Sequence, residues 1–106
     1  RGAASKSDVV KIFLGKKKAL PGSSAIPIDQ DSGNSARVDF YKNTVKKSEA
    51  QLKSYWSRLI FTGKGQAPQV VGNDGDIKSM VSTNPNLLGY IEESSVDSSV
   101  KVIYKP

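Results

Sequence analysis

The segment from Ala25 to Lys46 constrains the fold more than any other part of the sequence. Residues 25–30 are mostly apolar and predict a strand, with Pro27 placing it near a sheet edge or at a strand start. A polar loop follows, and then apolar residues recur at helical spacing at Val38, Tyr41 and Val45. This spacing predicts a helix over residues 35–46 with one apolar face. Together these segments predict a strand–loop–helix unit.

A strand followed by a polar loop and a helix start is how α/β proteins build anion sites. Unpaired backbone N–H groups and the positive end of the helix dipole point at one spot there. In the loop, Ser32, Asn34 and Ser35 offer side-chain donors, Gly33 allows close backbone approach, and Arg37 offers a guanidinium fork. The loop therefore predicts an oxyanion site.

A plainer interpretation of the loop remains open. Asn34 or Ser35 can simply cap the helix, which is the commoner role of such residues. Asp29 and Asp31 also bring negative charge to the same place, which opposes anion binding.

The rest of the chain predicts helices and strands in alternation. Ser7-Asp8 is a helix cap, the helix runs to Leu14, and Gly15 ends it, with a turn at Pro21-Gly22. Further helices are expected from Ser48, with a capping box to Gln51, as far as Gly63, and from Asn73 or Asp74 to residue 83. Residues 64–72 are expected to form a loop, and residues 87–91 and 100–104 strands. The expected core residues are Val9, Val10, Ile12, Phe13, Leu14, Val38, Tyr41, Val45, Leu52, Trp56, Leu59, Ile60, Ile77, Met80 and Val81. The fold class is α/β, with a small mixed β-sheet and helices packed on it.

Length and composition indicate one domain over residues 1–106, with residues 1–6 expected to be a flexible end or an expression remnant. No apolar run approaches the roughly 18 residues of a membrane span, so we expect no membrane insertion, and the chain shows no signal peptide.

Cysteine and histidine are both absent. Their absence excludes disulfides, thiol and histidine catalysis and Cys/His zinc sites, and no other catalytic constellation is present. We therefore expect no enzymatic activity, no cofactor and no metal.

The positive charge lies unevenly along the chain. Residues 1–65 hold 13 Lys or Arg and 5 Asp or Glu, whereas residues 66–106 hold 3 and 5. A basic half with Tyr41, Tyr55 and Trp56 admits nucleic-acid binding as a hypothesis. Trp56 fits the buried stripe of its helix, however, and the lysines fall on several faces, so the pattern disfavours this partner. The lysines can equally serve solubility alone.

Three segments, in order along the chain, resemble one protein family. They are Val9-Val10-Lys11-Ile12-Phe13-Leu14-Gly15-Lys16, then Trp56 before Thr62-Gly63, then Asn84-Pro85-Asn86-Leu87-Leu88-Gly89-Tyr90-Ile91. They are similar to segments of the phosphate-type periplasmic solute-binding proteins of ABC transporters. The resemblance covers residues 7–104 and implies one lobe of the type II periplasmic binding protein fold, with no counterpart of the second lobe.

The resemblance implies a transport function, a periplasmic location and a membrane transporter as partner. It places the family's oxyanion-binding loop at Gln30, Ser32, Gly33, Asn34, Ser35, Ala36 and Arg37. That family loop typically reads Arg-x-Asp-x-Ser-Gly-Thr-Arg, of which only the last arginine, Arg37, is retained. The resemblance therefore implies weak or altered binding of a small oxyanion such as phosphate. The alternative is a protein-interaction or self-associating module that keeps the fold of the lobe but has lost its ligand.

Overall fold

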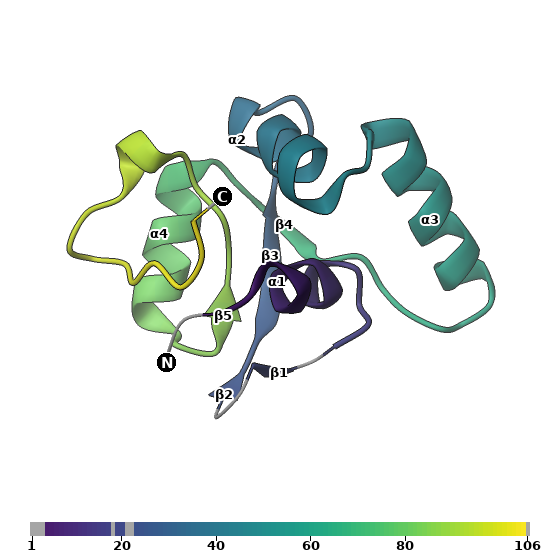
Figure 1. Ribbon diagram of the computed structural model, residues 1–106, viewed down its shortest axis with the longest axis horizontal. Coiled ribbons are helices and arrows are strands. Elements are labelled where there is room, and N and C mark those ends of the chain that lie inside the picture. Colours follow the sequence, from purple (N-terminus) through teal and green to yellow (C-terminus); the bar gives the residue numbers. More distant parts are fainter. Residues whose placement is uncertain (1–3, 18, 21–22, 106) are drawn as a thin grey trace.

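The computed structural model describes residues 4–17, 19–20 and 23–105 and shows an α/β fold (Figure 1). The expectations for residues 1–3 and for the turn at Pro21-Gly22 lie outside these residues. The helices are α1 (Lys6–Phe13), α2 (Ser35–Asp39), α3 (Glu49–Phe61) and α4 (Asp74–Thr83), with a π-helical segment η1 (Phe40–Val45) and a 3₁₀ turn η2 (Glu93–Ser95). The strands are β1 (Ala19–Leu20), β2 (Ser23–Ser24), β3 (Ile26–Gln30), β4 (Gln69–Gly72) and β5 (Leu87–Leu88).

The central sheet is parallel, with strand order β4-β3-β5. The prediction of a mixed sheet was therefore wrong in this respect. Helices connect β3 to β4 and β4 to β5, and such crossovers are what parallel neighbours require. The antiparallel pairing that the structure does contain lies in the separate β1–β2 hairpin.

Two strand assignments made from the sequence were wrong. Residues 100–104 form no strand and instead cross the molecule as an extended segment, in which Ala4 N–H donates to the Ile103 carbonyl at 2.8 Å. Conversely, β4 lies in the stretch that was expected to be a loop. The alternation of apolar and polar residues that identifies a strand in a sequence is absent from β4, because the strand has four residues, exposes Val70 and ends on Gly72.

Side-chain caps define where α1, α3 and α4 begin. Ser48 and Gln51 form the predicted capping box of α3, and Asn73 forms another with Asp76 at the start of α4. The cap predicted at Ser7-Asp8 was wrong, because Ser5 caps α1 by accepting from the Asp8 N–H at 3.1 Å. Residues 4–6 thus belong to the fold.

The helix predicted over residues 35–46 changes its winding halfway. It is α-helical to Asp39 and π-helical from Phe40 to Val45. Tyr41 and Val45 are buried as predicted, whereas Val38 is 43% exposed. A π-helical turn holds more residues than an α-helical turn, so the face that is buried after Phe40 does not continue back to Val38.

The core lies on both sides of β3. One cluster joins α1 to β5 through Val9, Ile12, Phe13 and Leu88, and another joins η1 to α3 around Tyr41, Leu52 and Trp56. Helix α3 projects to one side of the molecule (Figure 1), and its Ile60, expected in the core, is 55% exposed. Val10, Leu59, Met80 and Val81 are partly buried.

Glycine is required where Gly15 turns the chain out of α1. Its φ is +74°, and a Cβ there would lie 3.1 Å from the Trp56 ring. Trp56 of α3 therefore packs against the turn after α1, where only glycine leaves enough room. Among the described helices, none has the length and apolar character needed to cross a membrane.

Candidate functional site

A buried carboxylate, Asp29, organises the carboxyl end of β3. Its side chain accepts hydrogen bonds from the Tyr41 hydroxyl at 2.6 Å, from the Tyr90 hydroxyl, and from the Gln30 N–H at 2.9 Å. Arg37 completes the group, with its Nη1 3.2 Å from Asp29 Oδ2. A buried charge is tolerated only when it is paired and hydrogen-bonded, and Asp29 meets both conditions.

Arg37 joins this buried group to the surface. Its side chain is only 12% exposed, and Nη1 also donates to the Gln30 carbonyl at 3.0 Å. On its outer side Nε and Nη2 donate to the two carboxylate oxygens of Glu49, at 2.7 and 3.2 Å. Burial lowers the pKa of Arg37, but the hydrogen bonds to Glu49 and the charge of Asp29 raise it, and the net shift is upward. The guanidinium therefore keeps its charge at any pH at which the protein folds.

The two tyrosines that contact Asp29 are held in their neutral form. Burial raises the pKa of Tyr41 and of Tyr90, and the charge of Asp29 raises both further. Both hydroxyls therefore act as hydrogen-bond donors to the carboxylate. Their role here is to hold Asp29 in place.

The structure places the predicted loop residues in three groups. Gln30 and Asn34 face inward: Gln30 Nε2 donates to Asp74 Oδ1 at 2.8 Å and to the Tyr90 carbonyl at 2.7 Å. Asn34 Nδ2 donates to the Gly72 carbonyl at 3.2 Å. These two side chains fasten the loop to β4 and α4.

Ser35 and Ala36 lie on another side of the loop. Ser35 Oγ donates to Glu92 Oε1 at 2.7 Å, and Ala36 is buried. Ser32 and Gly33 are exposed at the tip, where Gly33 takes a φ of +97°.

Ser32 and Arg37 meet at an open cavity of about 440 Å³, which we call the Arg37 cavity. It lies between the loop, the first half of α3 and the segment before β4. Its charged lining residues are Asp29, Arg37, Glu49 and Lys53, and Trp56 and Val70 line its apolar part. Two of the seven predicted site residues thus share one cavity, beside charged residues from α3.

The first turn of α2 has no side-chain cap. Asn34 occupies the N-cap position with an extended backbone, but its side chain makes no capping hydrogen bond. The interpretation of Asn34 as a capping side chain was therefore wrong. Because the first N–H groups of a helix have no partner within the helix, this end still has donors to offer.

Sequence reasoning missed most of the polar network. Tyr41 was assigned to the core, and Tyr90, Glu49, Lys53 and Asp74 were given no role in the site. One signal was present: Asp29 lies next to the end of the predicted strand, and α/β proteins place their sites at the carboxyl ends of strands. The other residues of the network lie far from Asp29 in the sequence, so they could not be found without knowing how the strands and helices are arranged.

Within the described part of the chain, no group of three or more acidic residues is arranged to hold a metal ion. Comparison of the chain with protein-family models, with curated proteins and with solved structures gave no match in any of the three.

Proposed function

We propose that this chain is a non-catalytic, phosphate-type solute-binding domain that takes a small oxyanion at Arg37. The observation that carries the proposal is the position of Arg37, whose charged fork is held by Asp29 from within and faces the Arg37 cavity from outside. Oxyanions prefer such a fork because two parallel N–H bonds match two of their oxygens.

The carboxylate of Glu49 marks where the oxyanion would sit. Its two oxygens accept from Nε and Nη2 of Arg37, which is the bidentate arrangement that a phosphate would adopt. The Glu49 side chain is 46% exposed, and exposed ion pairs contribute little stability. An incoming anion therefore displaces a weakly held carboxylate while Asp29 keeps Arg37 in position.

Neighbouring groups support the same site. Ser32 lines the Arg37 cavity with an exposed hydroxyl, and Lys53 adds a second cation there. Asp29 and Glu49 reduce the net positive charge, and the cavity is open to water. We therefore expect weak binding, with a dissociation constant in the millimolar to micromolar range, or about 4–8 kcal/mol.

The proposal also includes the setting that the resemblance implies, namely a periplasmic protein that serves an ABC transporter in the membrane. Gln30, Asn34, Ser35 and Ala36 then support the loop, since the first three are hydrogen-bonded to other parts of the protein and Ala36 is buried.

Titration calorimetry with phosphate and with sulfate, followed by NMR shifts of residues 30–37, tests the proposal. Glu49→Gln removes the competing charge, so the affinity for phosphate should rise several-fold. Glu93→Gln makes the same chemical change at an exposed glutamate that pairs with Lys105, and it should leave the affinity unchanged. The absence of heat and of shifts at residues 30–37, in the parent and in Glu49→Gln alike, would refute oxyanion binding.

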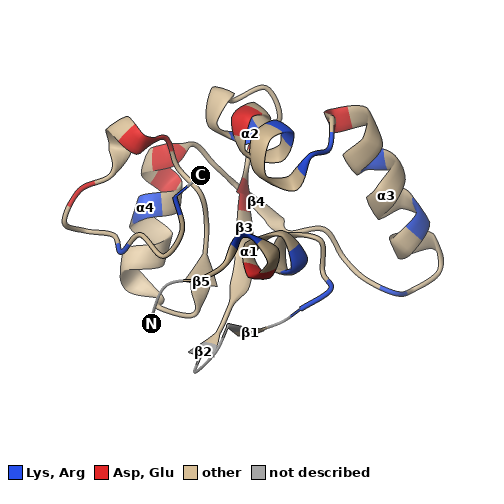
Figure 2. Ribbon diagram, viewed as in Figure 1, with Lys and Arg blue, Asp and Glu red and all other residues tan. Residues whose placement is uncertain are grey.

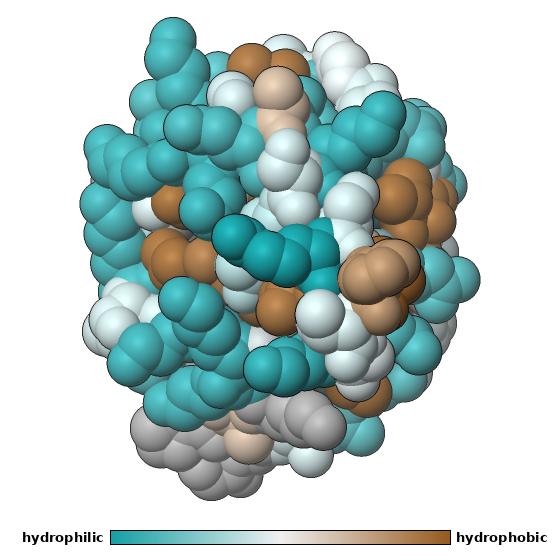
Figure 3. All heavy atoms as spheres, turned by 90° about the vertical axis from the view of Figure 1, so that its right-hand side faces the viewer, coloured by the Kyte–Doolittle hydropathy of each residue, from teal (hydrophilic) through white to brown (hydrophobic). Residues whose placement is uncertain are grey.

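A second candidate function, a protein-interaction module, rests on the outer face of α3. Phe61 is 92% exposed beside Ile60. Residues 40–73 hold six Lys or Arg and one acid, Glu49, which Arg37 already pairs. Figure 2 shows this basic side and the acidic side around α4, and Figure 3 shows apolar residues between polar ones on the face seen from the α3 side.

An exposed phenylalanine with a basic surround fits a partner surface that offers an apolar pocket and carboxylates. Sedimentation distinguishes the self-associating form of this module from the solute-binding domain. A tight dimer that buries the 30–37 loop and is lost in Phe61→Ser supports it. A monomer whose loop responds to phosphate supports the solute-binding domain instead.

A further inference from the structure

We propose that the edge of β5 that faces away from β3, which pairs with no other strand among the residues that the structure describes, accepts one extended peptide strand that carries apolar side chains on both of its faces. The strand would lie in a cavity of about 650 Å³, which we call the β5-edge cavity. This proposal is independent of oxyanion binding, because the Arg37 cavity lies on the other side of β3, towards α3.

The order of the lining residues places the cavity beside the edge of the sheet. Five consecutive residues, 87–91, line it. Successive side chains of an extended segment point to opposite faces, so a cavity on one face would be lined by alternate residues only. A cavity that meets every residue in turn runs along the backbone edge.

Backbone groups of that edge point towards the cavity. Ile26 N–H donates to the Asn86 carbonyl at 2.8 Å, and Ile26 is paired with Leu87 in the parallel register. In a parallel pair the residues that bond to the neighbouring strand alternate with residues that face away. Asn86 and Leu88 therefore face β3, whereas the carbonyls of Leu87 and Gly89 face the other side. An unpaired strand edge is a template for another strand.

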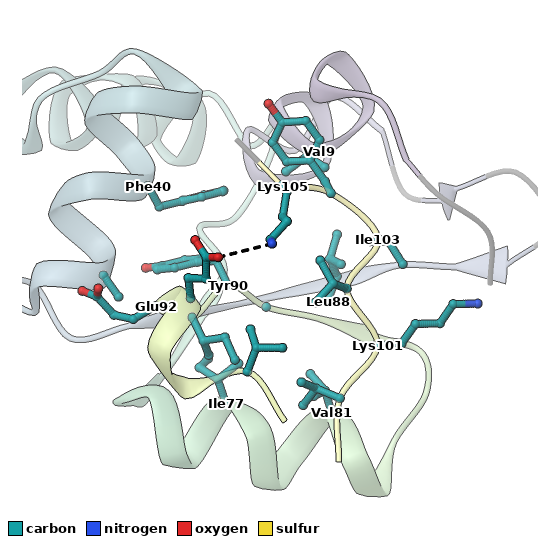
Figure 4. A pocket seen from close by; sticks show the side chains of 18 of the residues that line it. Val9, Phe40, Ile77, Val81, Leu88, Tyr90, Glu92, Lys101, Ile103 and Lys105 are labelled. Atoms are coloured by element: carbon teal, nitrogen blue, oxygen red, sulfur yellow. Dashed lines mark ion pairs between the residues drawn. The ribbon is translucent and has the colours of Figure 1, made fainter. Parts of the chain in front are cut away.

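The walls of the cavity define the chemistry of the occupant. In Figure 4, Ile77 and Val81 of α4 lie on one side of the cavity, and Phe40 and Val9, from η1 and α1, lie on the other. A strand added to β5 would direct its side chains alternately at these two walls. It must therefore be apolar on both faces, like the inner strands of parallel sheets.

Access to the cavity is controlled by the extended C-terminal segment. Residues 99–105 line it on the side of the C-terminal segment, and Lys105 forms an ion pair of 3.3 Å with Glu93, which also lines the cavity (Figure 4). Both side chains of this pair are well exposed, so the ion pair itself adds little to holding the segment, which is also held by the hydrogen bond from the Ala4 N–H to the Ile103 carbonyl at 2.8 Å. An apolar cavity lacks contacting atoms, so a strand that fills it gains both burial and dispersion contacts.

A short synthetic peptide tests the proposal on the protein as it stands. The probe is a peptide of five alternating valines and isoleucines, with two lysines at each end for solubility. We expect saturable NMR shifts at residues 87–91 and 99–105, with no change at Ser32 and Lys53, which line the Arg37 cavity alone. The matched control is the same peptide with alternate backbone amides N-methylated, which keeps the apolar side chains but removes the strand-pairing donors, and it should bind at least tenfold more weakly.

A pair of valine variants tests the wall. Val81→Lys places a charge in the cavity and should abolish peptide binding, whereas Val38→Lys makes the same change at an exposed valine outside it and should not. Equal binding of both peptides would overturn the proposal in favour of a site for small apolar molecules. The same shifts on raising the protein concentration alone would assign the edge to a second copy of the chain. Absence of peptide-induced shifts in the folded parent protein would also overturn it.

Discussion

The Arg37 cavity and the β5-edge cavity lie on opposite sides of β3 and differ in almost every physical respect. Around the Arg37 cavity, charged and polar groups bond to one another, and Asp29 alone collects Tyr41, Tyr90 and Arg37. The β5-edge cavity is lined mainly by apolar side chains and by a strand edge. In the first region the charged groups already bond to one another, and in the second a cavity is bounded by side chains that offer few polar partners.

This difference indicates how each region would respond to a ligand. At the Arg37 cavity a ligand must replace an existing partner, so its affinity is a small difference between two similar interactions. At the β5-edge cavity an incoming strand displaces the ion pair between Lys105 and Glu93 and part of the C-terminal segment, whose Ile103 carbonyl accepts from the Ala4 N–H. Selectivity is therefore expected at the first region and a gain in stability on binding at the second.

The strongest test of the polar region is Asp29→Ala. This change leaves Arg37 and two buried hydroxyls without their common acceptor. We expect a loss of about 3–5 kcal/mol in the free energy of unfolding, the usual cost of removing one partner of a buried ion pair. Urea denaturation followed by circular dichroism measures it.

Asp31→Ala is the matched control, because Asp31 is exposed and two residues away. It should change the stability by no more than about 0.5 kcal/mol. Similar losses in both variants would mean that the Asp29 network does not hold the region together.

Alkaline pH should weaken the same region. The folded state holds Tyr41 and Tyr90 neutral, with each pKa raised above the value of about 10 in the unfolded chain. Above pH 10 the unfolded state therefore binds fewer protons than the folded state, and stability falls as the pH rises. The expected slope is about 1.4 kcal/mol per pH unit for each tyrosine.

Thermal melting at a series of pH values from 8 to 11 measures this slope, and Tyr90→Phe should reduce it by about half. Stability that stays constant up to pH 11 would contradict the account of these tyrosines.

Gly89→Ala tests how closely the apolar region is packed on its α4 side. A Cβ at this position would lie 2.5 Å from Cγ2 of the buried Ile77 and 3.3 Å from Ile28. We expect a loss of about 1–3 kcal/mol from overpacking. The loss should be smaller in an Ile77→Ala background, which a double-mutant cycle measures. Gly65→Ala, where the nearest atom would be 3.6 Å away, is the neutral control.

Local chemistry made much of the fold predictable. The capping box at Ser48, the cap at Asn73 and the apolar pair of Leu52 and Trp56 each depend on residues close together in the sequence, and all three predictions were confirmed. The α/β class was confirmed for the same reason. The parallel sheet was not foreseen, because β4 and β5 are short and owe their pairing to β3, far away in the sequence.

The candidate site was predictable only at its loop. The loop position and Arg37 follow from the order of strand, polar residues and helix. The pairing of Arg37 with Asp29 and Glu49 depends on how α3 and η1 fold back, which no local pattern encodes. The π-helical turn at residues 40–45 likewise moved Val38 to the surface without a sequence signal.

The smallest expected effect concerns Glu49, the second carboxylate on Arg37. Asp29 and Glu49 bond to the same guanidinium, but Asp29 is buried and Glu49 is exposed to solvent. Glu49→Gln should therefore cost less than about 1 kcal/mol of stability, as exposed ion pairs do, in contrast to Asp29→Ala. Urea denaturation of the two variants side by side gives the comparison. A loss for Glu49→Gln that equals the loss for Asp29→Ala would mean that both carboxylates are structural, and Glu49 could then not give way to an oxyanion.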